Sequence, residues 1–218
     1  DHTCRAGQPC TLGSFTGEGL TTADALSFPL AVALCGRSPQ DLGPYPVLLG
    51  SHKQLDSALQ VHLTGGEDGD TMRGGVWRMC YCTDFTGCAD DRSFSALIGY
   101  LTIQGLSTRS TTQTCLAGVP CSIGPLVGQG LSSFDKVVFL TKLGHWPTDS
   151  VVHQVLGKCG DSDFQRDPDN FNDQYKEVSS TFEVSLAASD MPRGGRWRIC
   201  YCTSGGASLG CASSGDFG

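Results

Sequence analysis

The sequence has no apolar run of about 18 residues, the length that a membrane-spanning helix needs, so we expect no membrane insertion. Positive charge is also scarce, because 15 Lys and Arg face 22 Asp and Glu, for a net charge of -7. Nucleic-acid binding requires clustered Lys and Arg, so the charge balance argues against a nucleic-acid partner. Charged residues make up 17% of the chain, whereas 29 of its 218 residues are Gly. Such a composition favours turn-rich β-structure over long helices.

Short catalytic and cofactor-binding motifs are missing as well. The chain contains no Gly-x-Ser-x-Gly nucleophile motif, no phosphate-binding loop and no dinucleotide-binding fingerprint. We therefore expect no catalytic residue, no cofactor-binding residue and no cofactor. A secreted enzyme or inhibitor is the least favoured hypothesis, although scattered residues can still meet in a fold. The histidines do not recur at equivalent positions and match no metal-binding or catalytic-triad pattern; they are His2, His52, His62, His145 and His153.

What the chain has in abundance is cysteine, with 12 residues, six in each half. An even and repeated set predicts a disulfide framework and an oxidising compartment, extracellular or at the cell surface. Zinc is disfavoured because the Cys-Tyr-Cys spacing is too close for a zinc knuckle and no His repeats near it. Six cysteines allow fifteen pairings, and the sequence does not choose among them. The pairing that we favour closes the loops beside the central strand of each half: Cys4–Cys10, Cys35–Cys80 and Cys82–Cys88, then Cys115–Cys121, Cys159–Cys200 and Cys202–Cys211.

One stretch organises each half of the chain. Residues 76–82 (VWRMCYC) return as residues 196–202 (RWRICYC), each after Arg-Gly-Gly and each followed by Gly-Cys-Ala. The alternation predicts a strand, because successive side chains of a strand point to opposite faces. One face then carries Trp, Tyr and the apolar residue between them, and the other carries Arg and both cysteines. We expect Trp77 and Trp197 to be core residues.

Further landmarks recur in the same order. Residues 3–10 (TCRAGQPC) and 17–20 (GEGL) return 111 positions later as residues 114–121 (TCLAGVPC) and 128–131 (GQGL). The offset is 124 at the Cys-Gly pair and 120 at the Cys-Tyr-Cys strand. Fixed landmarks with drifting offsets indicate an internal repeat, with matching strands and loops of variable length.

The chain is therefore predicted to be all-β, with two tandem, disulfide-stapled Ig-like β-sandwich modules at residues 1–108 and 109–218. Pro29, inside an apolar run, indicates an edge strand at residues 27–29. Short strands are expected in the first module near residues 10–15, 25–30, 31–35, 47–49, 59–63, 76–82 and 94–104, and in the second near residues 135–140, 151–156, 181–186 and 196–202.

The two copies differ after their last cysteine. The first continues through residues 98–105 (IGYLTIQG), whereas the second stops at residues 216–218. We expect the second module to lack its closing strand, and either a longer chain or a strand from another molecule to complete it. An unfilled strand position leaves an open edge, which favours pairing with a further strand.

Two acidic loops are candidates for a hard cation such as Ca²⁺, because clustered carboxylates supply its oxygen ligands. Neither loop fits the twelve-residue calcium pattern, and the two loops are not equivalent in the repeat. A solvated acidic loop without a metal is the favoured interpretation. In the calcium interpretation the ligands are Asp68, Asp70, Asp167, Asp169 and Asp173.

The combined pattern resembles a known kind of repeat. It consists of a Thr-Cys-x-Ala-Gly-x-Pro-Cys opening, a Cys-Gly, a Trp-Arg-x-Cys-Tyr-Cys strand, a Gly-Cys and a Gly-x-Leu-x-Ile-x-Gly close. It resembles the tandem cysteine-rich, Ig-like repeats of large secreted protist proteins, and flagellar-hair (mastigoneme) proteins look similar. The resemblance covers the whole chain as two modules. It implies an extracellular structural or adhesive role, with many modules in series and no catalysis.

We accordingly expect an extracellular structural protein whose repeat modules form a filament, a flagellar hair or a surface coat. The expected partners are copies of the protein itself or neighbouring modules of a longer chain. The alternative is a secreted adhesion or glycan-binding module that uses loops at one end of the sandwich. This binding would be calcium-dependent if the acidic loops hold the ion.

Overall fold

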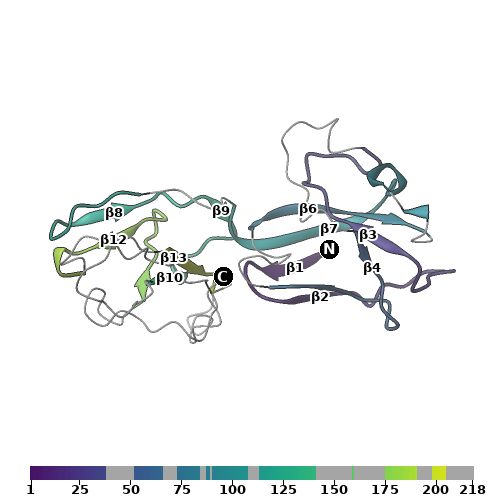
Figure 1. The fold of residues 1–218 in the computed structure, drawn as a ribbon, viewed down its shortest axis with the longest axis horizontal. Coiled ribbons are helices and arrows are strands. Elements are labelled where there is room, and N and C mark those ends of the chain that lie inside the picture. Colours follow the sequence, from purple (N-terminus) through teal and green to yellow (C-terminus); the bar gives the residue numbers. More distant parts are fainter. Residues whose placement is uncertain are drawn as a thin grey trace, which may run out of the picture. The chain divides into compact units, whose positions relative to one another are not determined.

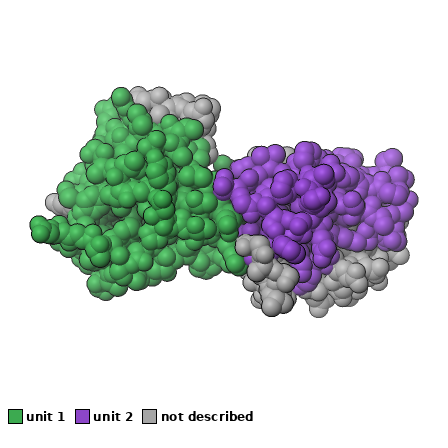
Figure 2. Space-filling view, turned by 180° about the vertical axis from the view of Figure 1, so that it is seen from behind, with its two compact units in different colours: residues 1–104 green, residues 105–218 purple. Residues whose placement is uncertain are grey.

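The computed structural model describes residues 1–37, 52–65, 73–83, 87–88, 90–107, 113–140, 159, 175–190 and 198–204. These residues form an all-β structure, with short 3₁₀ helices at Asp91–Ser93 and Ala188–Asp190 and no α-helix. The chain divides into two compact units, Asp1–Gln104 (unit 1) and Gly105–Gly218 (unit 2) (Figures 1 and 2). Within the described ranges, no helix has the length and the apolar character needed to cross a membrane.

The larger sheet of unit 1 brings the first and the last strand of that unit together. Its strand order is β1 (His2–Arg5), β7 (Ala96–Leu106), β6 (Gly75–Cys82), β3 (Ala25–Ser27) and β4 (Lys53–Gln54) (Figure 1). β1 lies parallel to β7, whereas the other neighbours in this order run antiparallel. Each strand of the sheet is therefore held by a segment that is distant in the sequence.

A second, two-stranded sheet belongs to unit 1. It consists of β2 (Cys10–Leu12) and β5 (Val61–Leu63), which pair antiparallel. Val61 and Leu63 are buried and His62 between them is exposed, as alternation along a strand predicts. Both sheets contribute to one core, whose buried members are Cys4, Leu12, Leu26, Phe28, Leu55, Val61, Leu63, Trp77, Met79, Leu101 and Ile103.

β6 has the alternation that its sequence predicts. Trp77 and Met79 are buried in the core of unit 1, and Tyr81 packs against that core. Cys80 and Cys82 alternate with these residues along the strand and lie in a separate buried cluster. The predicted core position of Trp77 is confirmed. One strand thus serves the hydrophobic core with one face and the disulfides with the other.

Unit 2 uses corresponding strands. β10 (Lys136–Leu140) pairs antiparallel with β11 (Lys176–Glu177) on one side and with β13 (Arg198–Cys202) on the other. β8 (Cys121–Ile123) and β12 (Val184–Leu186) form a separate antiparallel pair. These strands again share one core, whose buried members are Ile123, Val137, Phe139, Val178, Val184, Leu186 and Tyr201.

The registers of the two units match where corresponding strands pair in both. Cys10 faces Leu63 in unit 1 as Cys121 faces Leu186 in unit 2. β1 has no paired counterpart, because residues 113–116 lie in no strand. In unit 1 this strand is held by β7, and the described residues of unit 2 include no counterpart of β7. β1 therefore depends on the closing strand for its partner.

Unit 2 also contains a short pairing at its start. Gly105 and Leu106, the last two residues of β7, pair antiparallel with β9 (Gly128–Gln129). The amide of Ser107 donates a hydrogen bond to the carbonyl of Val127 at 3.0 Å, which extends the ladder by one residue.

Two strand predictions are wrong. Residues 31–35 form turns, because the amide of Ala33 donates to the carbonyl of Leu30 at 2.8 Å. The edge strand expected around Pro29 is also wrong, because β3 ends before the proline and lies between β6 and β4. Proline has no N–H to donate, so the strand stops ahead of it. Several expectations lie outside the described residues: the strands at 47–49 and 151–156, the position of Trp197, and the missing closing strand, which concerns residues 205–218.

The core of unit 1 can be tested with two leucines of β7. Leu101 is 0% exposed, so Leu101→Ala should lower the free energy of unfolding by about 2–5 kcal/mol through lost burial and a residual cavity. Leu97 lies in the same strand but is 44% exposed, and Leu97→Ala should change it by less than about 0.5 kcal/mol. Urea unfolding followed by tryptophan fluorescence measures both. Equal losses would contradict the placement of Leu101.

Candidate functional site

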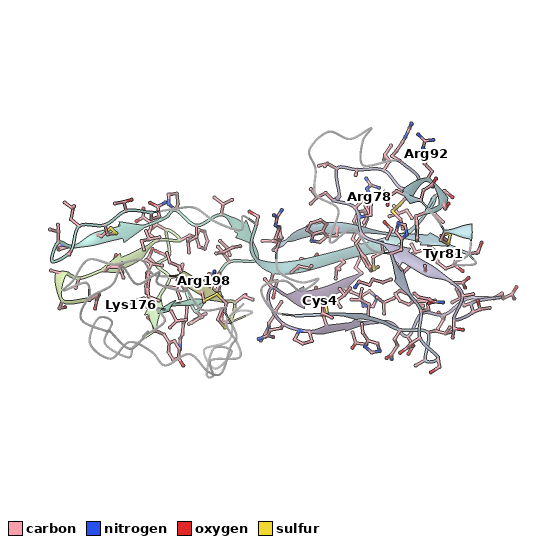
Figure 3. All side chains as sticks on the ribbon, viewed as in Figure 1. Cys4, Arg78, Tyr81, Arg92, Lys176 and Arg198 are labelled. Atoms are coloured by element: carbon pink, nitrogen blue, oxygen red, sulfur yellow. A yellow bond between two sulfur atoms is a disulfide. The ribbon has the colours of Figure 1, made fainter. Side chains whose placement is uncertain are left out.

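Disulfide bridges hold the central strand of each unit (Figure 3). The described residues contain Cys4–Cys10, Cys35–Cys80, Cys82–Cys88, Cys115–Cys121 and Cys159–Cys200, which are pairs expected from the sequence. Cys202 is also disulfide-bonded, and its expected partner, Cys211, lies outside the described residues. The long bridges span 45 residues in unit 1 and 41 residues in unit 2, and each ties a loop to the central strand.

The calcium interpretation gains no ligand cluster from the described part of the chain. Its candidates all lie outside those residues: Asp68, Asp70, Asp167, Asp169 and Asp173. Within the described ranges, no group of three His, Cys, Asp or Glu side chains could hold a metal ion. The counterpart of Asp70 in the repeat is Asp190, because each stands three positions before Arg-Gly-Gly. Asp190 forms an ion pair with Lys176 at 2.6 Å, so in unit 2 a lysine neutralises this carboxylate.

A buried tyrosine–aspartate cluster occurs in both units. In unit 2, Asp135 is 0% exposed and stands directly before β10. Its carboxylate accepts hydrogen bonds from the Tyr201 hydroxyl and from the amide of Ser132 at 2.7 Å. It also accepts from the amide of Ser204 at 2.8 Å and from the hydroxyl of Ser204 at 2.9 Å. These charge-assisted bonds satisfy the buried carboxylate and join the turn before β10 to β13.

Unit 1 repeats this arrangement with Asp24 and Tyr81, which lies in β6 (Figure 3). The Tyr81 hydroxyl and the amide of Thr21 each donate to the Asp24 carboxylate at 2.8 Å. The amide of Asp24 donates back to the carbonyl of Thr21 at 3.2 Å, as that of Asp135 does to Ser132 at 3.0 Å. In both units the aspartate therefore closes its own turn and fixes that turn to the central strand.

Burial and the aspartate keep both phenols protonated. Desolvation, followed by the hydrogen bond to Asp24, raises the pKa of Tyr81 to about 12. Desolvation and then the bond to Asp135 also raise the pKa of Tyr201. A phenol that holds its proton so firmly is a poor base and a poor nucleophile at neutral pH. The cluster therefore serves as a polar crosslink between the turn and the central strand.

Sequence reasoning missed this cluster, although one signal was present. Residues 21–24 (TTAD) and 132–135 (SSFD) are 111 positions apart, the offset of the opening cysteines. Ser or Thr three residues before Asp, ahead of a strand, is typical of a side-chain-capped turn. The tyrosines lie 57 and 66 residues away in the sequence, and no local pattern links them to the turns.

A second polar arrangement lies on the surface of the β2–β5 pair. Thr11 Oγ1 lies 3.0 Å from His62 Nδ1, and His62 Nε2 lies 2.9 Å from Asp56 Oδ2. The order of groups is that of a nucleophile, a base and an orienting acid. The His62 side chain is 61% exposed, however, so water reaches it freely, and unit 2 carries Ser185 at the corresponding strand position. We interpret the arrangement as a surface network.

Asp56 is also bound by the main chain. The amides of Ala58 and Gln60 each donate to its Oδ1 at 2.8 Å. The bond from Gln60, followed by that from His62, holds the pKa of Asp56 below its ordinary value. The carboxylate thereby supports the turn between β4 and β5, which is a structural role. Sequence reasoning did not find this network because 51 residues separate Thr11 from His62.

Arg78 lies on the cysteine face of β6 (Figure 3). Its Nε donates to the carbonyl of Ala31 at 2.9 Å, and its guanidinium carbon lies 5.6 Å from the centroid of the Tyr100 ring. The residue therefore ties the loop after β3 and a side chain of β7 to the central strand. Both contacts serve the fold of unit 1.

The strongest candidate for an interaction site is made by backbone at the start of unit 2. We call residues 105–107 the lead-in segment and residues 127–129 the receiving edge. A Cβ atom on Gly128 would lie 2.2 Å from the carbonyl oxygen of Gly105, a distance that real Cβ atoms do not tolerate. Glycine at position 128 is therefore required by the close approach of the lead-in segment.

Side chains support this pairing. Leu106 of the lead-in segment and Leu131, just beyond the receiving edge, both pack against the core of unit 2. The hydroxyl of Ser107 donates to the carbonyl of Val127 at 3.0 Å, beside the bond from its own amide. Main-chain bonds thus fix the register of the lead-in segment, and one leucine anchors it.

Comparisons with protein-family models, with curated proteins and with solved structures found no match to this chain. What the protein does has to be inferred from its own repeat and from the contacts described above.

The tyrosine–aspartate cluster predicts a loss of stability in alkali. The folded state raises the pKa of Tyr81 from 10.0 to about 12. The protonated phenol therefore stabilises the fold fully below about pH 10, and this contribution is lost as the pH rises through about 12. Tyr81→Phe should make the urea midpoint fall less steeply across that window, because Phe does not titrate. Midpoints at pH 8 and at intervals above pH 10 measure the difference, and parallel curves would count against the role of Tyr81.

Proposed function

We propose that this chain is part of an extracellular structural protein, in which tandem modules assemble into a filament, a flagellar hair or a surface coat. The observation that carries the proposal is the double occurrence of one scaffold. Both units have corresponding strands, opening and long disulfides, and tyrosine–aspartate clusters. The acid–base arrangement around His62, by contrast, is not repeated. Repetition of the scaffold without repetition of reactive groups favours a structural array over a catalyst.

Each module is proposed to be an Ig-like β-sandwich. In support, two separate sheets of each unit contribute side chains to one core. Trp77 at the centre of β6 also fits the sandwich pattern of a core tryptophan on a central strand. One feature departs from that pattern, because Cys80 lies outside the main core and binds Cys35 in a turn. The disulfide therefore staples a loop to one sheet, where an antibody domain links two sheets.

The disulfides also support the extracellular assignment and a mechanical role. Many bridges in a chain of this size are typical of extracellular proteins, because the cytosol keeps thiols reduced. Each long bridge encloses a loop of the unit, with a sequence separation of 45 for Cys35–Cys80 and of 41 for Cys159–Cys200. A module stretched under load would extend only by the residues outside its bridges. Neighbouring modules would then share the load instead of one module unravelling.

A second candidate function, adhesion, is favoured by one loop. Leu116 and Val119 are 71% and 47% exposed on the loop that Cys115–Cys121 closes. The counterpart loop of unit 1 carries Arg5 and Gln8 at these positions. Exposed apolar side chains on a constrained loop are typical of a binding surface. Glycan binding, calcium-dependent if the acidic loops hold the ion, is the specific form of this alternative.

The state of the native material decides between these functions. Mass spectrometry of non-reduced material, beside electron microscopy of the undissociated sample, measures the size of the parent chain and its assembly. A regular filament or a larger chain of such modules supports the structural proposal. A discrete monomer of 23.0 kDa would overturn it. Glycan binding that is lost in a Leu116→Ser, Val119→Ser variant would then establish adhesion.

Single-molecule stretching tests the mechanical role. With the bridges intact, each module should unfold in a short step. Loss of the long bridge alone should lengthen the step by about 150 Å for unit 1 and about 140 Å for unit 2, because 45 and 41 residues at about 3.4 Å each become free. Reduction also opens the short bridges, so it should lengthen each step by at least this much. A Cys35→Ser, Cys80→Ser variant should show the longer step of unit 1 without reductant and keep the short step of unit 2. Steps that do not change on reduction would exclude a load-limiting role.

A further inference from the structure

The receiving edge of unit 2 has a counterpart in unit 1. Residues 16–18 correspond to residues 127–129, because GEGL at 17–20 and GQGL at 128–131 are 111 positions apart. In unit 2 the edge pairs with the lead-in segment. In unit 1 residues 16–18 lie in no strand and are exposed. The same sequence element is therefore paired in one unit and unpaired within the described residues of the other.

Packing among the described residues does not require glycine at position 17. A Cβ atom on Gly17 would meet only the side chain of Leu20, at 3.3 Å, whereas one on Gly128 would meet backbone at 2.2 Å. Neither glycine is among those with a positive φ, so backbone conformation requires glycine at neither position. What makes glycine necessary at position 128 is the close approach of another strand. Gly17 lacks that neighbour among the described residues.

The neighbouring leucines differ in the same way. In unit 2, Leu131 packs against the core together with Leu106 of the lead-in segment. In unit 1, the corresponding Leu20 is not among the side chains that pack against the core. Among the described residues of unit 1, none forms a strand pair with residues 16–18 as Leu106 does with Gly128 in unit 2. Residues 16–18 thus present main-chain groups that are unpaired within the described ranges, beside the apolar side chain of Leu20.

We propose that residues 16–18 bind the end of the closing strand of a neighbouring module. The bound segment is extended and antiparallel, and it carries Gly-Leu-Ser or a close equivalent. By the register of unit 2, its glycine faces Glu18, its leucine faces Gly17 and lies near Leu20, and its serine donates to the carbonyl of Thr16. This inference rests on the proposed function, because it takes the partner to be another module.

The partner has to be a different module from those described. The lead-in segment of this chain is already bound to its own receiving edge through Gly105 and Leu106. A second copy in the same state has no such segment to give. The segment that binds residues 16–18 is therefore the end of another closing strand. It pairs with residues 16–18 as residues 105–107 pair with residues 127–129. Modules joined in this way would all follow one another head to tail.

The test supplies the missing segment to the full chain. Residues 101–111 are duplicated ahead of Asp1, which places a lead-in sequence at the spacing found in unit 2. Hydrogen exchange of the amides of residues 16–18 is then compared with that of the unextended chain. We expect exchange to slow by at least about tenfold, because pairing replaces contact with water. Residues 127–129 of the same molecule are the internal standard for an occupied edge.

Two glycine variants form a matched pair. Gly17→Ala should leave the melting temperature of the unextended chain unchanged, because the added atom meets only the flexible side chain of Leu20. In the extended chain the same variant should abolish the protection of residues 16–18. Gly128→Ala in the unextended chain should abolish protection of residues 127–129, because its Cβ would meet the carbonyl oxygen of Gly105.

Two results would overturn the proposal. One is unchanged exchange at residues 16–18 in the extended chain while residues 127–129 stay protected. The other is slowed exchange that survives Gly17→Ala. A filament seen by microscopy together with either result would leave the structural function in place and remove only this edge from it. Protection of residues 16–18 in a protein that never assembles would support the pairing at this edge and remove the structural function.

Discussion

The alternation of side chains along the central strand is the constraint on which the rest of each unit depends. In unit 1 this strand sends Trp77 and Met79 into the core and Cys80 and Cys82 to the other face. Tyr81, on the core side, then reaches the buried Asp24. A slip of one residue in register would expose the tryptophan and break the hydrogen bond and the disulfide geometry at once. Packing, covalent bonding and a polar crosslink therefore all specify the same register.

The disulfides offset a limitation of small β-modules. A unit of 104 residues buries a modest core, and fixing its many loops costs conformational entropy. By loop-closure entropy, a bridge that spans 45 residues, such as Cys35–Cys80, stabilises by about 4 kcal/mol. A bridge over six residues, such as Cys4–Cys10, contributes about 2 kcal/mol. The long bridge is thus the more important one for stability, while the short bridges shape the loops beside the strands.

Local sequence patterns predicted the structural features that depend mainly on neighbouring residues. The period-two alternation of residues 76–82 predicted β6 and the burial of Trp77. The repeated cysteines predicted a disulfide framework, although their spacing did not choose among the possible pairings. The strand expected at residues 31–35 is wrong, because an apolar run does not determine which groups its main chain will bond. The amide of Ala33 donates to the carbonyl of Leu30, and the segment forms turns. The pairing of β1 with β7 and the contact between Asp24 and Tyr81 join segments far apart in the sequence. A single sequence carries no record of such contacts.

The parallel pairing of β1 with β7 has a consequence for how the protein is made. His2 lies opposite Leu101, so the first strand of this unit has to wait for the last strand of the same unit. At a synthesis rate of about 5–20 residues per second the delay is roughly 5–20 s. Cys4 and Cys10 are close enough to pair during this time, but β1 has no partner until β7 arrives. Folding of the sheet is then a late, single event of high contact order, which is slow by nature. The unpaired strand would have to be shielded until then, and a nascent chain cut short before β7 would release a unit whose sheet cannot close.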